Sequence, residues 1–215
     1  MNNNHLKKKI GDIYRKLYRS FGPQSWWPGD TPFEVIVGAI LTQNTNWQNV
    51  AKAIDNLKKA KVLTPQKLHS LPLDKLARLI RPSGYFNIKA KRLKSFLDFL
   101  FKNHQGKLEK MFSLPLDELR KDILAVKGIG PETADSILLY AGGLPVFVVD
   151  AYTKRIFSRK KLFPEDTDYH QVQKIFMENL KKDVQLFNEY HALLVRLGKD
   201  FCKKTKPKCE ICPIK

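Results

Sequence analysis

The sequence has 215 residues, of which 43% are hydrophobic, so the chain can bury a sizeable core and falls between one domain and two in length. Lysine and arginine number 39 against 21 aspartate and glutamate, a net charge of +18. Such a surplus attracts polyanions and favours a nucleic-acid partner, with a lysine-rich solvated surface as the alternative. The longest apolar run, 35–41, is too short to cross a bilayer. The N-terminus has no signal-peptide core, so we expect an intracellular, cytoplasmic protein without a membrane partner.

Apolar residues recur at helical spacing along most of the chain, with clear stripes at 47–57, 93–101 and 172–180. Proline follows Thr64 and Gly130, and proline favours the first turn of a helix because its missing N–H costs no hydrogen bond there. Only 146–149 has a β-like composition. The sequence therefore predicts an all-α fold with about ten helices.

The basic residues are spread along the chain, which argues against a single disordered basic tail. They gather in five runs: 7–9, 58–61, 89–94, 159–161 and 203–208.

A glycine-rich turn between two helical patterns is the most informative stretch of the sequence. Gly128-Ile129-Gly130 lies between a pattern at 116–124 and one at 134–141. Glycine lets the backbone approach a phosphate closely, and the following helix N-terminus offers free N–H groups. We therefore favour phosphate binding over a plain turn.

Asp150 follows this turn by 20 residues and directly precedes another helical pattern. Taken alone, an aspartate there is typical of a helix N-cap. An N-cap position is compatible with a second role for this carboxylate.

All three cysteines lie in the last 14 residues: Cys202, Cys209 and Cys212. In an intracellular protein, such clustering suggests a metal site or cluster before a disulfide.

Taken together, the hairpin at 126–130, the segment at 149–152 and the Cys-x6-Cys-x2-Cys spacing resemble the endonuclease III superfamily of helix-hairpin-helix DNA glycosylases. The segments 41–45 and 84–90 look like further signatures, and the resemblance covers about 32–212. It implies a six-helix barrel domain at 24–142 containing the hairpin. A second helical domain would combine 1–23 with 143–215, with the active site in the interdomain cleft. The implied partner is double-stranded DNA with a damaged base, bound by a nucleoid-associated monomer.

The resemblance also implies roles for single residues. Asp150 would be the catalytic residue, stabilising the sugar cation and orienting water. Gln43 would fill the gap left by the flipped base, and Tyr85 would wedge against the partner strand. The backbone of the DNA would be contacted by Lys127, Gly128 and Gly130. Either Gln43 or Tyr85 could instead be an ordinary loop residue.

One departure from the family pattern bears on the chemistry. Bifunctional members carry a nucleophilic lysine where this chain has Glu132, and a carboxylate cannot form the Schiff base. The resemblance therefore implies a monofunctional glycosylase without AP-lyase activity, closest to the 3-methyladenine DNA glycosylase III branch. Because 3-methyladenine in DNA is cationic, electron-rich indoles suit it. The expected base pocket consists of Trp26 and Trp47 around the base, Trp27 and Pro28 as its wall, and Glu132.

The tryptophans could instead be core residues. The cysteine spacing matches three ligands of the family's [4Fe–4S] loop, whose fourth cysteine would follow Cys212 by six residues and is missing from this chain. The chain could be truncated before that cysteine, another ligand could replace it, zinc could bind instead, or the site could be degenerate. Alternative functions are a glycosylase for mismatched or oxidised pyrimidines, a glycosylase with lyase activity, and a non-catalytic DNA-binding module.

Overall fold

The computed structural model describes residues 3–24, 26 and 29–215, and over these residues it is helical, without a β-strand. The all-α prediction is confirmed. Twelve α-helices occur in the described ranges rather than about ten, because helices of five to seven residues have too few turns to show a 3.6-residue stripe. The chain divides into two compact units, 27–144 and 1–26 with 145–215, where the sequence suggested boundaries at 24 and 142. None of the described helices is long and apolar enough to cross a membrane.

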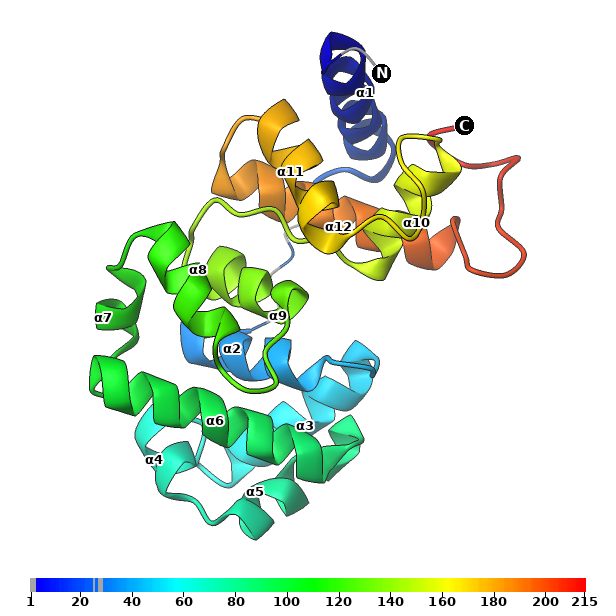
Figure 1. Ribbon diagram of the computed structural model, residues 1–215. Coiled ribbons are helices and arrows are strands. Elements are labelled where there is room, and N and C mark those ends of the chain that lie inside the picture. Colours follow the sequence, from blue (N-terminus) through cyan, green and yellow to red (C-terminus); the bar gives the residue numbers. More distant parts are fainter. Residues whose placement is uncertain (1–2, 25, 27–28) are drawn as a thin grey trace. The chain divides into compact units, whose positions relative to one another are not determined.

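The unit 27–144 contains most of the helices (Figure 1). They are α2 (Pro32–Leu41), α3 (Trp47–Lys59), α4 (Pro65–Ser70), α5 (Leu73–Leu79), a 3-10 turn (Arg81–Ser83), α6 (Phe86–His104), α7 (Leu108–Phe112), α8 (Leu116–Leu124) and α9 (Pro131–Ser136), which continues into a π-helical turn (Ile137–Ala141).

Helix α2 forms the centre of this unit. Its residues from Phe33 to Gly38, together with Ile40 and Leu41, are buried, as expected for a helix that is apolar all round. It packs against α3, α6, α9 and the π-helical turn. Thr31 caps its start by accepting a hydrogen bond from the Glu34 N–H.

The two helix starts predicted from proline are confirmed. Pro65 lies in the first turn of α4, where Thr64 is the N-cap and accepts from the Lys67 N–H. Pro131 opens α9, directly after Gly130. Pro131 therefore also marks the end of the hairpin turn.

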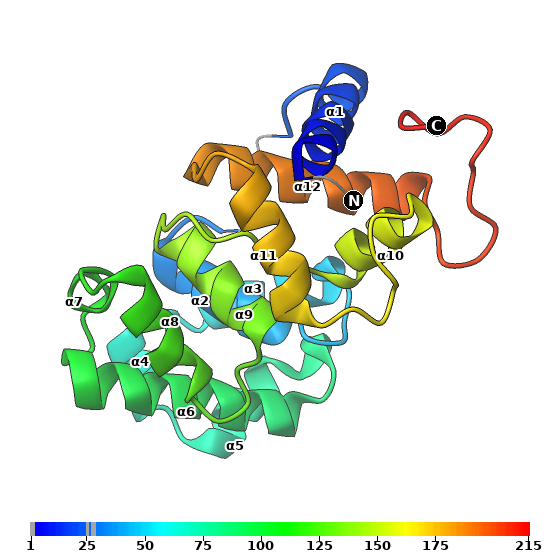
Figure 2. The same cartoon turned by 45° about the horizontal axis from the view of Figure 1, so that its top comes forward.

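The second unit contains α1 (Asn3–Phe21), α10 (Ala151–Arg159), α11 (Tyr169–Asn179) and α12 (Val184–Asp200), shown from a second angle in Figure 2. Its core is an aromatic cluster of Phe147, Phe157, Phe176, Phe187 and Tyr190. The buried Tyr190 hydroxyl donates to the Ile10 carbonyl (2.8 Å), which ties α12 to α1.

The β-like segment 146–149 is extended but pairs with helix α11 instead of a strand. The Phe147 N–H donates to Met177 Sδ (3.3 Å), and the Phe147 carbonyl accepts from the Gln173 amide (2.7 Å). The Val149 N–H donates to the Tyr169 hydroxyl (3.3 Å). Since Tyr169, Gln173 and Met177 are four residues apart, one face of α11 satisfies this buried backbone. The segment leads directly into Asp150.

Candidate functional site

The two hairpin glycines meet different surroundings. Gly128 has a φ of 89°, and a Cβ there would lie 2.5 Å from Cγ of Arg92, so packing inside the unit requires glycine. Gly130 is extended, and no described atom lies within 4 Å of the place where its Cβ would be. Ile129 between them is buried and anchors the turn, while Lys127 is exposed. The turn therefore presents an accessible backbone at Gly130.

A buried ion pair joins the helices on either side of this turn. Arg120 of α8 donates from Nε and Nη2 to the two carboxylate oxygens of Asp135 in α9, at 2.7 and 3.0 Å. Asp135 is fully buried. Such a two-bond pair fixes orientation as well as distance, so it holds the hairpin helices together.

Glu132 lies in the first turn of α9 and is exposed. Its backbone carbonyl accepts from the Ser136 hydroxyl at 2.7 Å. A carboxylate is favourable at a helix N-terminus because of the helix dipole. The structure thus places Glu132 on the surface next to the hairpin turn.

Gln43 follows α2 and is bonded to the hairpin. Its Nε2 donates to the Thr133 hydroxyl at 2.9 Å and to the Gly128 carbonyl at 3.4 Å. Its Oε1 accepts from the Arg92 guanidinium. The Gln43 side chain therefore has a defined position between α6 and the hairpin.

Tyr85 stands on the surface just before α6. Its side chain is 69% exposed and its φ is 46°, in the left-handed region that non-glycine residues rarely adopt. Ile88, one turn later, is 51% exposed. Two large apolar side chains here are exposed to solvent, as a surface that packs on a partner requires.

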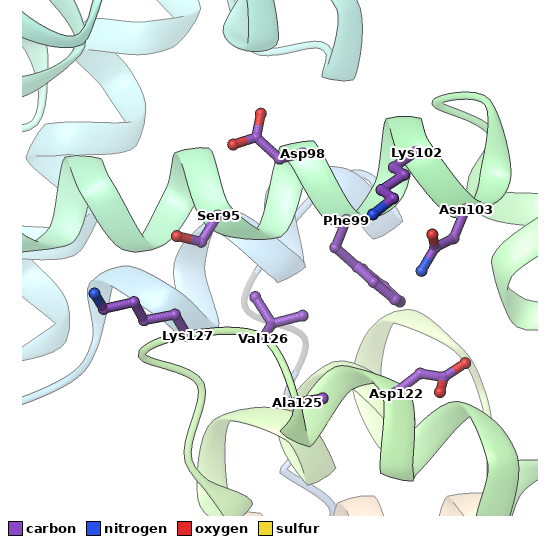
Figure 3. Close-up of a pocket in the computed structure, with 9 residues that line it drawn as sticks. All are labelled: Ser95, Asp98, Phe99, Lys102, Asn103, Asp122, Ala125, Val126 and Lys127. Atoms are coloured by element: carbon purple, nitrogen blue, oxygen red, sulfur yellow. The ribbon is translucent and has the colours of Figure 1, made fainter.

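A pocket of about 300 Å³ lies between α6 and the end of α8, and Figure 3 shows Val126 pointing toward α6 across it. Its lining mixes carboxylates, amines and apolar groups: Ser95, Asp98, Phe99, Lys102, Asn103, Asp122, Ala125, Val126 and Lys127. Of the predicted site residues only Lys127 lines it. This pocket therefore is not the predicted base pocket.

Asp150 is the N-cap of α10 and is 8% exposed. Its Oδ1 accepts from the N–H and the hydroxyl of Thr153, at 2.7 and 2.8 Å. Its Oδ2 lies 3.5 Å from Nε2 of the buried His191 in α12. Burial raises the pKa of Asp150, but His191 and the Thr153 donors together outweigh burial and hold the pKa below its usual value. The site thus contains a desolvated carboxylate that stays ionised.

The predicted tryptophans are partly buried where they are described. The Trp26 indole stacks on the His191 ring, with centroids 5.7 Å apart and planes 9° from parallel. His191 therefore contacts both Trp26 and the Asp150 carboxylate. Trp47 opens α3 and packs over Gly38 of α2. Trp27 and Pro28 lie outside the described residues.

Helix α10 also holds the start of the cysteine loop. Arg155 donates from Nε to the Cys202 carbonyl (2.8 Å), and Arg159 donates to the Lys203 carbonyl (2.8 Å). Cys209 is exposed, while Cys202 and Cys212 are half-buried. In the part of the chain that the structure describes, no three His, Cys, Asp or Glu side chains are arranged to hold a metal ion. As placed here, the three cysteines do not fit a metal centre.

Sequence reasoning missed two partners of Asp150. Thr153, three residues after an N-cap, follows a local pattern that could have identified it. His191 lies within the apolar pattern of α12, and nothing local in the sequence connects it with Asp150. Lys89 was counted among the basic runs but is buried, with only 1% exposure.

Comparisons with known proteins identify a family model and relatives that match this chain. A family model described as "HhH-GPD superfamily base excision DNA repair protein" matches residues 37–182, more than half of the chain. An inferred DNA repair glycosylase of Methanocaldococcus jannaschii is 50% identical over 208 residues, covering 96% of this chain and 94% of the relative. An endonuclease III of Rickettsia conorii is 30% identical over 210 residues, covering 98% and 93%.

Solved structures share the fold. The 3-methyladenine DNA glycosylase of H. pylori bound to 1,N6-ethenoadenine has a TM-score of 0.76 at 31% identity, covering 93% of this chain and 98% of that one. An endonuclease III in a non-covalent complex with DNA has a TM-score of 0.82 at 24% identity, covering 97% and 92%, and shows the fold alone.

Proposed function

We propose, from the premise that this chain belongs to the HhH-GPD superfamily of base excision DNA repair proteins, that it is a monofunctional glycosylase for alkylated purines. The family model and the relatives show that the chain is a DNA repair glycosylase. The proposal adds its substrate and the absence of AP-lyase activity. The substrate is 3-methyladenine flipped out of duplex DNA. Water, rather than a lysine, attacks the sugar.

The exposed Glu132 is the observation that carries this proposal. It follows the hairpin glycines in the first turn of α9, where the sequence resemblance places the nucleophilic lysine of bifunctional glycosylases. A carboxylate cannot form a Schiff base with the sugar, so β-elimination of the strand is lost. Lys127 precedes the glycines, and we assign it to the DNA phosphates.

Asp150 suits hydrolysis of a base that is already a good leaving group. A cationic 3-methyladenine departs as a neutral base, so no general acid is needed. The sugar becomes oxocarbenium-like, and a nearby anion stabilises it. A buried carboxylate with a lowered pKa supplies that anion over the physiological pH range. Asp150 also orients the attacking water.

Base recognition is assigned to Trp26 and Trp47, with Trp27, Pro28 and Glu132. An indole face attracts a cationic ring by about 0.5–2 kcal/mol. The Trp26 indole stacks on the His191 ring, and this contact fixes the orientation of the indole that would meet the base. The similarity to an H. pylori enzyme named for 3-methyladenine supports this substrate class.

DNA contacts are assigned to the hairpin and the exposed turns. Gly130 has an accessible backbone and no internal reason to be glycine, which suits a phosphate that approaches closely. Tyr85 is exposed enough to wedge into a base stack. Gln43 would leave its bonds to Thr133 and Gly128 to fill the gap.

An iron–sulfur cluster is a separate proposal and no part of the chemistry above. It would need the loop to bring Cys202, Cys209 and Cys212 together and to recruit a fourth ligand. Iron and acid-labile sulfide near four per chain, lost in Cys209→Ala, would support it. Protein that is active and free of iron would contradict it.

The lyase prediction is tested by borohydride trapping on DNA with an abasic site. The wild type should give no covalent complex, whereas Glu132→Lys should gain one because it restores an amine at this position. Glu118→Lys, on the exposed surface of α8, is the control and should gain none. A trapped complex with the wild type would overturn the proposal. If no alkylated purine is released, mismatched and oxidised pyrimidines are the substrates to test next.

A further inference from the structure

Lys89 is buried, whereas most other lysines in the basic runs are exposed. Its side chain is 1% exposed, in the first turn of α6. Its Nζ donates to the Leu41 carbonyl at 2.8 Å and to the Ser83 carbonyl at 2.6 Å. Burial lowers the pKa of Lys89, and the charge of Arg92 lowers it further. Because burying an ammonium is costly, the two carbonyls must compensate for that cost.

The two carbonyls occupy equivalent places in the fold. Leu41 is the last residue of α2 and comes two residues before Gln43. Ser83 is the last residue of the 3-10 turn and comes two residues before Tyr85. Carbonyls at helix ends lack intrahelical partners and favour a cation. One ammonium therefore joins the two segments that lead into Gln43 and Tyr85.

We propose that Lys89 is a positioning residue that holds the Gln43 segment and the Tyr85 turn at a fixed separation, so that both side chains engage the same distorted DNA. This inference rests on the proposed function, in which both residues contact DNA. Lys89 itself touches neither DNA nor the reacting atoms.

Two further contacts support the inference. Arg92, three residues after Lys89 on α6, donates to the Gln43 side chain, so α6 fixes both the backbone before Gln43 and its amide. The Tyr85 carbonyl accepts from the Lys89 N–H at 3.0 Å, and Tyr85 has a positive φ that its surroundings must maintain. Lys89 therefore bonds to this turn twice, through its backbone N–H to Tyr85 and through its side chain to Ser83.

The same helix provides a matched control. Lys94 donates to the Leu68 carbonyl (3.0 Å) and to the His69 carbonyl, near the end of α4. Burial lowers its pKa as well. Lys94→Met therefore removes the same kind of contact from α6 without touching the segments before Gln43 and Tyr85.

Hydrogen exchange of the free protein tests the contact without relying on any activity. In Lys89→Met, amides in 42–46 and 83–88 should exchange about tenfold faster or more, because two bonds to a charged group are lost. Lys94→Met should leave these amides unchanged. Equal exchange in Lys89→Met and the wild type would overturn the inference. Should Lys89→Met fail to fold, Lys89→Gln replaces it.

A binding experiment tests the role. The probe is a duplex with an abasic-site analogue opposite 2-aminopurine, whose fluorescence rises on unstacking. Lys89→Met should lose about tenfold or more of the preference for this duplex over undamaged DNA, together with the fluorescence rise. Adding Gln43→Ala to Lys89→Met should cost little more, since Gln43 is already misplaced.

The outcomes separate this inference from the proposed function. A folded Lys89→Met protein with the wild-type preference, or an equal loss in Lys94→Met, would overturn the positioning role. A wild type without any preference for the abasic duplex would contradict the proposed function and the DNA role, while the exchange result would still decide whether Lys89 joins the two segments.

Discussion

The hairpin turn and the start of α10 are both helix N-termini, but different parts of the chain hold them in place. The hairpin is fixed mainly by its own turn and by the Arg120–Asp135 pair from the two flanking helices, with Gln43 as a further partner. Asp150 is fixed by Thr153 nearby and by His191 from α12. The hairpin exposes its backbone, whereas Asp150 is only 8% exposed.

This difference corresponds to the chemistry proposed for each region. A phosphate needs accessible N–H groups, which a short glycine turn provides by itself. A catalytic carboxylate is more effective when water is excluded, and it then needs donors to remain charged. Those donors require tertiary structure.

The largest effect is expected at Asp150. Asp150→Asn should lower the rate of base release by about 100- to 1000-fold or more, because the anion that stabilises the sugar cation is lost. Folding should persist, since asparagine caps helices as well as aspartate. Asp168→Asn, at the exposed N-cap of α11, should leave the rate unchanged. Unchanged activity in Asp150→Asn would contradict the catalytic role of Asp150, and no base release by either protein would favour a non-catalytic DNA-binding module.

The second-largest effect is a loss of stability when the Arg120–Asp135 pair of the hairpin is broken. Asp135→Asn should lower the free energy of unfolding in urea by about 1.5–3 kcal/mol, because the charge-assisted hydrogen bonds from Arg120 to a buried carboxylate are lost. Asp74→Asn breaks an exposed pair with Arg78 and should cost less than about 1 kcal/mol. Similar losses in the two variants would show that the buried pair does not hold the hairpin helices together.

Substitutions of the two hairpin glycines should separate an effect on stability from an effect on DNA binding. Gly128→Ala should lower the free energy of unfolding by about 1–3 kcal/mol, because its φ is positive and Arg92 occupies the space. Gly130→Ala should change it by less than about 0.5 kcal/mol yet weaken binding to duplex DNA. Urea denaturation and DNA titration measure the two effects. Full DNA affinity in Gly130→Ala would contradict the phosphate assignment.

The smallest effect is a pKa change. Thr153→Val removes one donor to the charged carboxylate, so the lowered pKa of Asp150 should rise toward the ordinary value of an aspartate. In the wild type, the lowered pKa contributes stability above the unfolded-state pKa, and this is lost as pH falls through the folded-state pKa. Carboxyl carbon NMR titration of Asp150 measures the shift. Thr167→Val, in the loop before α11, is the control, and an equal pKa in Thr153→Val and wild type would contradict this role.

The hairpin could be predicted from the sequence because its determinants are local: two glycines, a proline and flanking helical stripes. Asp150 could be selected through the family resemblance, and its N-cap position through the helical pattern that directly follows it. His191 could not, since its link to Asp150 exists only when α12 packs beside α10. Lys89 could not be singled out within its basic run, because such a run does not show that one ammonium serves two buried carbonyls.

Base release from dimethyl-sulfate-treated duplex DNA tests the central claim most directly, with Asp150→Asn alongside the wild type. The account predicts that the wild type releases 3-methyladenine and leaves the strand uncut, while Asp150→Asn releases it at least about 100-fold more slowly. Folded wild-type protein that releases no methylated base, or that cuts the strand by lyase chemistry, would contradict it.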